Sequence, residues 1–330
     1  MSRRIQVLSF LAGLGCFVPA TAGFAAVHPI TDYIVYGENG VKIGVGSTVG
    51  GLTGARNNYF PFQNSAVRLN GAASVLGDVR SGGNVNLGNG ASITGIVHYD
   101  GNTSTVNVPP SASVGGLDPN GPDLPPALPL ASIFPCPSPG PNDSGANGQS
   151  RSINQGTYGN YTFGAGFTLT LLDSGNYYFN SISTANGAKI VVNSPPVHIY
   201  ACGGANFGSV EVLPNSLNSA DVTLEAQGTG NAFSGNGGSN WIGNVYTPNG
   251  SIHFGGSGCC TFFNGQFLAG QQVDIEHGVT GTFTNCCSPL PRPNKDATIF
   301  HGDQNTNNGA NNTVRVKYQV SGIFGFFAAG

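Results

Sequence analysis

Two stretches of the chain carry the same apolar pattern at a fixed distance. "VRLNGAASVLGDV" begins at Val67, and "VNLGNGASITGIV" begins 18 residues later at Val85. A third copy begins at Val41, 26 residues before Val67, with the insertion-like segment "GARNNYFPF" between them. Each copy is typical of two short strands joined by Gly and Asn turns, which bury an apolar face only when stacked on an identical unit. The repeat therefore predicts a right-handed parallel β-helix, with one coil for each copy.

The second half of the chain shows a looser repeat with longer strands. "WIGNVYTPNGSIHF", which starts at Trp241, matches "FNGQFLAGQQVDI", which starts at Phe263, with Gly243 over Gly265. Upstream, "YTFGAGFTLTLLDSGNYYFNSISTANGAKIVV" alternates apolar and polar residues, as strands with one buried face do. We expect a second solenoid half here, followed by an Asn/Gly-rich loop and a closing strand with the apolar tail "GIFGFF".

Composition favours an all-β fold and argues against nucleic acid as a partner. Charged residues make up 8% of the chain, against about a quarter in ordinary soluble domains, so amphipathic helices with charged faces are not expected. The hydrophobic content of 39%, arranged in alternation, argues against disorder. With a net charge of −3 and no basic patch, nucleic acid is a poor candidate partner.

The N-terminus has the pattern of a secretory signal peptide. Arg3 and Arg4 precede an apolar run at residues 5–18 and a small-residue site, Ala-Thr-Ala, at 20–22. The run is too short to span a membrane, and no later stretch is long and apolar enough to do so. The protein is therefore expected to be secreted or displayed on the cell surface, with the periplasm as the alternative location.

A proline-rich segment separates the two halves. Proline removes backbone donors and keeps its neighbour extended, so we expect a long extended connection packed along the surface, with a disordered spacer as the alternative. The expected organisation is a signal peptide at 1–26, a short-coil half at 31–105, the connection at 106–150, a longer-coil half at 151–289 and the closing segment at 290–330.

Six cysteines remain after removal of the signal peptide, and an even number in an exported chain indicates disulfides. The simplest of about 15 connectivities pairs Cys136 with Cys202 and joins the two adjacent pairs to each other. The candidates are Cys136, Cys202, Cys259, Cys260, Cys286 and Cys287. The absence of CxxC and CxxCH motifs gives no support to zinc ribbons, redox motifs or c-type haem.

The repeats resemble those of known bacterial solenoids. "AVRLNGAASVLGDVRSGGNVNLGNGASITGIV" resembles the short-coil β-helices of bactofilin-like, polymer-forming proteins, and the second half is similar to surface and pilus-associated domains that have no assigned activity. Its layout is also similar to that of bacterial ice-binding β-solenoids, although this chain lacks a clean T-x-T pattern. These resemblances imply self-assembly or surface attachment, and no catalytic motif is shared.

The stretch "VDIEHG", at residues 273–278, is the main candidate for a catalytic or metal-binding site. If Val273 and Ile275 point inward, Asp274 and Glu276 share the outer face, about 7 Å apart. This spacing suits paired carboxylates or a cation site with His277, and the alternative is a pair of solubilising surface charges. His253 is expected one coil earlier beside Asp274, where a structural hydrogen bond is favoured over a metal site.

Trp241, the only tryptophan, has two interpretations. It packs in the core or caps it, which is favoured, or it forms a stacking platform for sugar.

Three functions are compatible with this pattern, and none needs a cofactor. The favoured one is a non-enzymatic structural or adhesive protein that binds itself or other surface and matrix components, through the open coil ends. The first of these ends is the N-terminal coil around Ile34 to Ile43. The second is the C-terminal strand from Val314 to Val320, whose apolar tail either caps the last coil or contacts a neighbour. A ligand-binding solenoid for ice or glycan is the alternative, and regular outward Thr or Asn files would favour it. A polysaccharide-active β-helix enzyme comes third.

Overall fold

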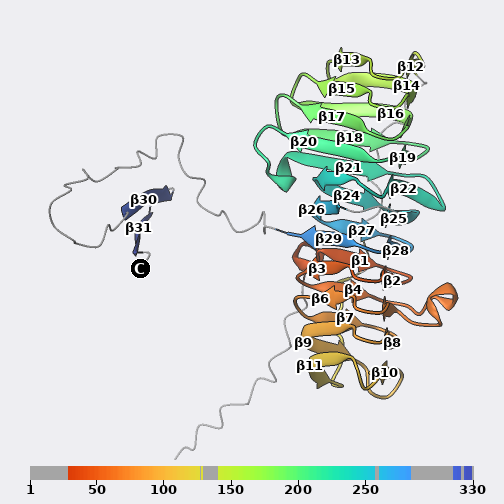
Figure 1. Cartoon of the computed structure of the whole chain (residues 1–330), viewed down its shortest axis with the longest axis vertical. Coiled ribbons are helices and arrows are strands. Elements are labelled where there is room, and N and C mark those ends of the chain that lie inside the picture. Colours follow the sequence, from red (N-terminus) through yellow and green to blue (C-terminus); the bar gives the residue numbers. More distant parts are fainter. Residues whose placement is uncertain are drawn as a thin grey trace, which may run out of the picture.

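The fold is an all-β parallel solenoid, seen in a computed structural model that describes residues 29–126, 128, 140–256, 260–283, 315–320 and 323–328. About 11 coils stack into one column with three faces, and almost no helix is present in the described residues (Figure 1). The only helical elements described are three 3-10 turns: η1 (Ile30–Asp32), η2 (Phe60–Phe62) and η3 (Ser219–Asp221). This confirms the predicted solenoid.

Each face is named after one of the first three strands. The β1 face holds β1 (Val35–Gly37), β4 (Thr53–Ala55), β7 (Val79–Ser81), β18 (Val197–Ala201), β21 (Val222–Ala226), β24 (Asn244–Thr247) and β27 (Phe267–Ala269). The β2 face holds β2 (Val41–Ile43), β5 (Val67–Leu69), β8 (Val85–Leu87), β10 (Val106–Asn107), β12 (Asp143–Gly145), β19 (Ala205–Phe207), β22 (Asn231–Asn236), β25 (Ser251–Gly255) and β28 (Val273–Ile275). The β3 face holds β3 (Thr48–Gly50), β6 (Ser74–Val75), β13 (Ser150–Ile153), β15 (Thr168–Leu171), β17 (Ala188–Val192), β20 (Val210–Pro214), β23 (Asn240–Ile242), β26 (Thr261–Asn264) and β29 (Val279–Thr282). Four long strands turn a corner between faces: β9 (Ser92–Tyr99), β11 (Ser113–Asp118), β14 (Gly156–Phe163) and β16 (Gly175–Thr184).

The sequence repeats coincide with the strand register. Val41, Val67 and Val85 are direct neighbours on successive coils, as the 26- and 18-residue offsets predict. Val245 pairs with Phe267 in the second repeat. All five side chains are at most 1% exposed, so each file of equivalent positions forms a continuous apolar column inside the solenoid. Burial of these columns drives the stacking.

The order of the coils along the column differs from the order of the sequence. Residues 29–118 stack from the middle of the column to one end, and residues 143–283 stack from the other end back to the middle (Figure 1). There β1, β2 and β3 pair in parallel with β27, β28 and β29. The expectation that the first coil is an open end is therefore wrong, because its outer edge is covered by the last coil of the second half.

The connection between the halves is shorter than predicted. Among the described residues, solenoid strands continue to Asp118 and begin again at Asp143, so both ends of the predicted connection at 106–150 belong to the solenoid. Its described first part lies against the β1 face. Arg80 Nη1 donates to the Pro122 carbonyl at 3.1 Å, and Glu38 Oε1 accepts from the Leu128 amide at 2.9 Å.

The C-terminal segment holds a hairpin instead of a single closing strand. β30 (Arg315–Val320) pairs antiparallel with β31 (Ile323–Ala328), which contains the apolar tail. Of the cysteines, only Cys202 and Cys260 lie within the described residues, so the disulfide pairing stays a prediction.

We predict that Phe267→Ala destabilises the protein by about 3–5 kcal/mol, because this ring is fully buried where the two halves meet. It stacks on Phe263 at a centroid distance of 4.3 Å and packs edge-on against Phe254 at 5.1 Å. Phe60→Ala is the matched control, since Phe60 is 84% exposed, and it should cost under about 0.5 kcal/mol. Urea unfolding measures both, and equal losses would contradict the assigned packing.

Candidate functional site

The predicted acidic pair lies on β28, between β25 and β2, at the junction of the two halves. Val273 and Ile275 are fully buried, which turns Asp274 outward. His253 of β25 is the registered neighbour of Asp274 on one side, and Lys42 of β2 is its neighbour on the other. The structure thus confirms that His253 and Asp274 are adjacent. It also adds Lys42, which lies 232 positions away in the sequence and was not predicted.

Lys42 supplies the positive charge of this group. Its Nζ donates to Asp274 Oδ2 at 2.7 Å and to Glu276 Oε1 at 3.3 Å. His253 is farther away: its Nδ1 is 3.8 Å from Asp274 Oδ2, and its Nε2 is 3.9 Å from Glu276 Oε1. These separations are too long for the predicted His253–Asp274 hydrogen bond. His277 is exposed in the turn after β28.

Burial raises the pKa of Asp274, while the hydrogen bond and charge of Lys42 act in the opposite direction. Its second oxygen, Oδ1, is buried and has no hydrogen-bond partner. His253, Asp274 and Glu276 offer ligand atoms within 4.8 Å of one another, but the Lys42 ammonium already lies against both carboxylates. The group is therefore best described as an ion pair that joins the first coil to the last.

Trp241 packs in the core. It is fully buried on β23, its Nε1 donates to the Gly243 carbonyl at 3.2 Å, and its ring lies 4.9 Å from Phe233 and 5.7 Å from Phe207. The favoured packing interpretation is confirmed, and the sugar-platform interpretation is wrong.

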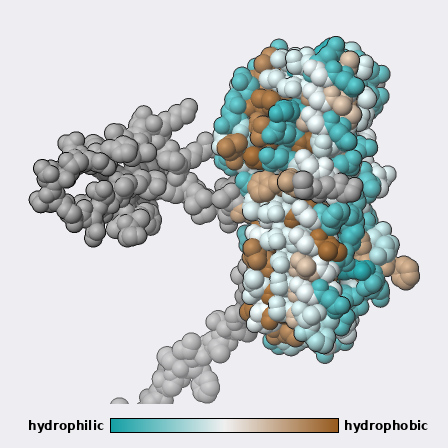
Figure 2. All heavy atoms as spheres, in the orientation of Figure 1, coloured by the Kyte–Doolittle hydropathy of each residue, from teal (hydrophilic) through white to brown (hydrophobic). Residues whose placement is uncertain are grey.

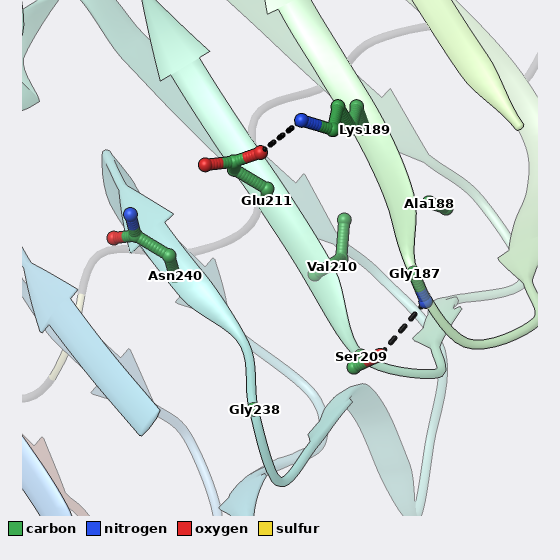
Figure 3. Close-up of a pocket in the computed structure, with 8 residues that line it drawn as sticks. All are labelled: Gly187, Ala188, Lys189, Ser209, Val210, Glu211, Gly238 and Asn240. Carbon is green, nitrogen blue, oxygen red and sulfur yellow. Dashed lines mark hydrogen bonds and ion pairs between the residues drawn. The ribbon is translucent and has the colours of Figure 1, made fainter. Parts of the chain in front are cut away.

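Shallow grooves mark the corners of the column. One of about 290 Å³ is lined by Lys189, Glu211, Asn240 and the small residues of the adjacent turn (Figure 3). Lys189 and Glu211 neutralise each other across 2.8 Å. A second groove of about 360 Å³ lies beside Asp143. Hydroxyls and a carboxylate line each groove, but no hydrogen bond joins a lining hydroxyl to a lining carboxylate in the described residues, so no reaction is assigned to the grooves.

A file of hydroxyl groups runs along the β3 face. Five residues on successive coils point outward at equivalent positions: Thr280, Thr48, Ser74, Ser92 and Ser113. Adjacent members lie one strand spacing apart, about 4.8 Å, and the Ser74 and Ser92 hydroxyls hydrogen-bond at 2.8 Å. The 26- and 18-residue offsets already connect Thr48, Ser74 and Ser92, so the sequence held a signal for this file that the search for T-x-T missed.

The two ends of the column differ in polarity. At the end formed by β10 and β11, the apolar files finish in Val106, Val114 and Leu117, all of them partly or largely exposed. At the other end, the inward positions of β12 and β13 include Asp143 and Arg151, which form an ion pair. One end thus exposes the apolar core, and the other is capped by charge. Figure 2 shows that between the ends, on the face in view, hydrophobic residues reach the surface as separate patches.

Comparison of the chain with protein-family models, curated proteins and solved structures finds no match. Among the described residues, no helix has the length and apolar character needed to cross a membrane.

We predict that Asp274→Asn changes the unfolding free energy by about 1 kcal/mol or less at neutral pH, since it removes one partner of a partly exposed ion pair. The change should depend on pH. Because the pKa of Asp274 is higher in the folded chain than in the unfolded chain, its contribution to stability is complete at low pH and declines as pH rises through the folded value. The unfolding free energy of the variant, relative to that of the wild type, should therefore increase as the pH rises. Urea unfolding across the acidic range measures this, and a constant difference would contradict it.

Proposed function

We propose that the protein is a secreted, non-enzymatic structural or adhesive component of a bacterial surface or matrix, which associates with itself or with other matrix components. The signal-like N-terminus and the low charge support this proposal, as does a column whose described residues offer faces, ends and shallow grooves rather than a deep cavity. A right-handed coil and disulfides among the six cysteines belong to the same proposal.

The observation that carries the proposal is the open end at β10 and β11. Leu117 occupies the position of the buried Val97 one coil earlier, yet it is 52% exposed because no described strand pairs with the outer edge of β11. Val108 and Ile96 nearby are 37% and 41% exposed. Unpaired strand edges beside exposed apolar side chains are favourable places for a further strand or an apolar surface to bind.

Adhesion is assigned to this end of the column alone. The opposite end closes with the Asp143–Arg151 ion pair, and burying that pair in an apolar contact would cost desolvation energy. The first coil, expected to be adhesive, lies inside the column. The end-coil surface of Val106, Val114 and Leu117 takes its place in the proposal.

We predict that Leu117→Lys weakens self-association or surface adhesion by at least about tenfold, since it places a charge in the apolar contact, where a charge that loses its water costs several kcal/mol. Leu76→Lys is a matched control, because Leu76 is also 52% exposed but lies beside the β3 face. Sedimentation and electron microscopy measure assembly, and circular dichroism checks the fold. Equal effects of the two variants, or none, would contradict the assignment to the end coil.

A ligand-binding solenoid is the second candidate, and the hydroxyl file of the β3 face favours it. Regularly spaced hydroxyls on a flat face match a repetitive surface such as ice or a glycan. Under this candidate, Ser92→Lys abolishes ice or glycan binding, whereas Asn86→Lys on the β2 face does not. Ice recrystallisation assays and glycan arrays measure it. Binding that survives Ser92→Lys would remove this candidate.

A further inference from the structure

The column is built from two stacks that meet along one seam. We call residues 29–118 the first stack and residues 143–283 the second stack. They contact each other through the pairings of β1 with β27, β2 with β28 and β3 with β29. The seam is therefore an interface between two coil ends, each of which presents unpaired strand edges when the other is absent.

Several side chains form hydrogen bonds across the seam. Gln266 Nε2 donates to the carbonyls of Thr31 and Tyr33, both at 2.7 Å. Ser47 Oγ accepts from the Val279 amide at 3.0 Å. Asn39 Nδ2 donates to Gln271 Oε1 at 2.7 Å, and Lys42 bonds Asp274 and Glu276 as described above. Every one of these bonds joins the first stack to the second. The Asn39–Gln271 and Ser47–Val279 bonds have counterparts at the same register within the stacks, whereas the contact of Lys42 with two carboxylates is found at the seam.

The length and path of the connection determine whether a first stack meets the second stack of its own chain or that of another chain. Its described part is bonded to the first stack, where Leu128 meets Glu38 in the coil of β1. From there the chain must reach Asp143, seven coils away along the column. Seven spacings of about 4.8 Å come to about 34 Å, whereas the 15 residues from Leu128 to Asp143 can extend to about 50 Å. The surplus length is sufficient to reach a second stack that lies beside its own.

We propose that the seam also forms between two copies of the chain, so that the first stack of one copy docks on the second stack of another. All contacts of the seam are the same in this exchanged form, and the balance between the two forms is set by protein concentration and by the connection. Reciprocal exchange gives a closed dimer, and open exchange gives a chain of columns. This surface is separate from the end coil, so the inference goes beyond the proposed function.

Charge reversal at the seam tests the exchange. In Lys42→Glu chains, three carboxylates meet within each chain, and in chains with Asp274→Lys and Glu276→Lys, three ammonium groups meet. An equimolar mixture of the two, unfolded and refolded together, can pair opposite charges only across chains. We expect at least about tenfold more heterodimer in the mixture than homodimer in either variant alone, measured by native mass spectrometry and light scattering. A chain with all three changes restores the pair in cis and should behave as the wild type.

Crosslinking provides a second measurement that locates the contact. Chains with Lys42→Cys are refolded with chains with Asp274→Cys, and the mixture is oxidised, so that only an exchanged seam places the two new thiols together. Mass spectrometry should find the 42–274 peptide pair across chains. Leu117→Lys in the background leaves this crosslink intact and separates it from adhesion at the end coil. Absence of both the heterodimer and the crosslink, with each variant folded by circular dichroism, overturns the proposal.

Discussion

No coil of this protein can bury its own apolar side chains, and the rest of the structure follows from that constraint. The column is stable because Val41, Val67, Val85 and their equivalents cover one another in register, coil upon coil. A stack that depends on neighbours must end somewhere, and each end leaves apolar atoms and strand edges uncovered. The chain deals with its four coil ends in different ways. Two cover each other at the seam, one carries an ion pair, and one stays open.

The seam gives the acidic pair of β28 a structural role. Asp274 and Glu276 hold Lys42 of the first coil, which places opposite charges on the two coil ends that must find each other. Half-buried ion pairs contribute little net stability, but a wrong alignment would leave a partly buried charge without a partner. We interpret the group as a determinant of register and partner choice rather than of chemistry. The same complementarity would guide a second copy to the seam.

The sequence predicted the spatial neighbours of residues that belong to one repeat, but not those of residues in different repeats. The register of Val67 with Val85 and of Val245 with Phe267 follows directly from the offsets. The proximity of His253 to Asp274 also follows, since both lie in the second repeat. Lys42 was missed because no repeat connects it to Asp274. The hydroxyl file was missed because it runs across coils, whereas a motif search reads along the chain.

The sequence by itself determined the period, the inward-facing positions and the all-β class, because these depend on local alternation and on spacing between copies. The tertiary structure decided that the first coil lies in the middle of the column, that one true end is apolar and the other charged, and that Lys42 meets Asp274. The physical reason is that the seam joins coils that belong to different repeats and lie 232 positions apart in the sequence. Their fit arises from side-chain complementarity between two surfaces, which exist only after each stack has folded.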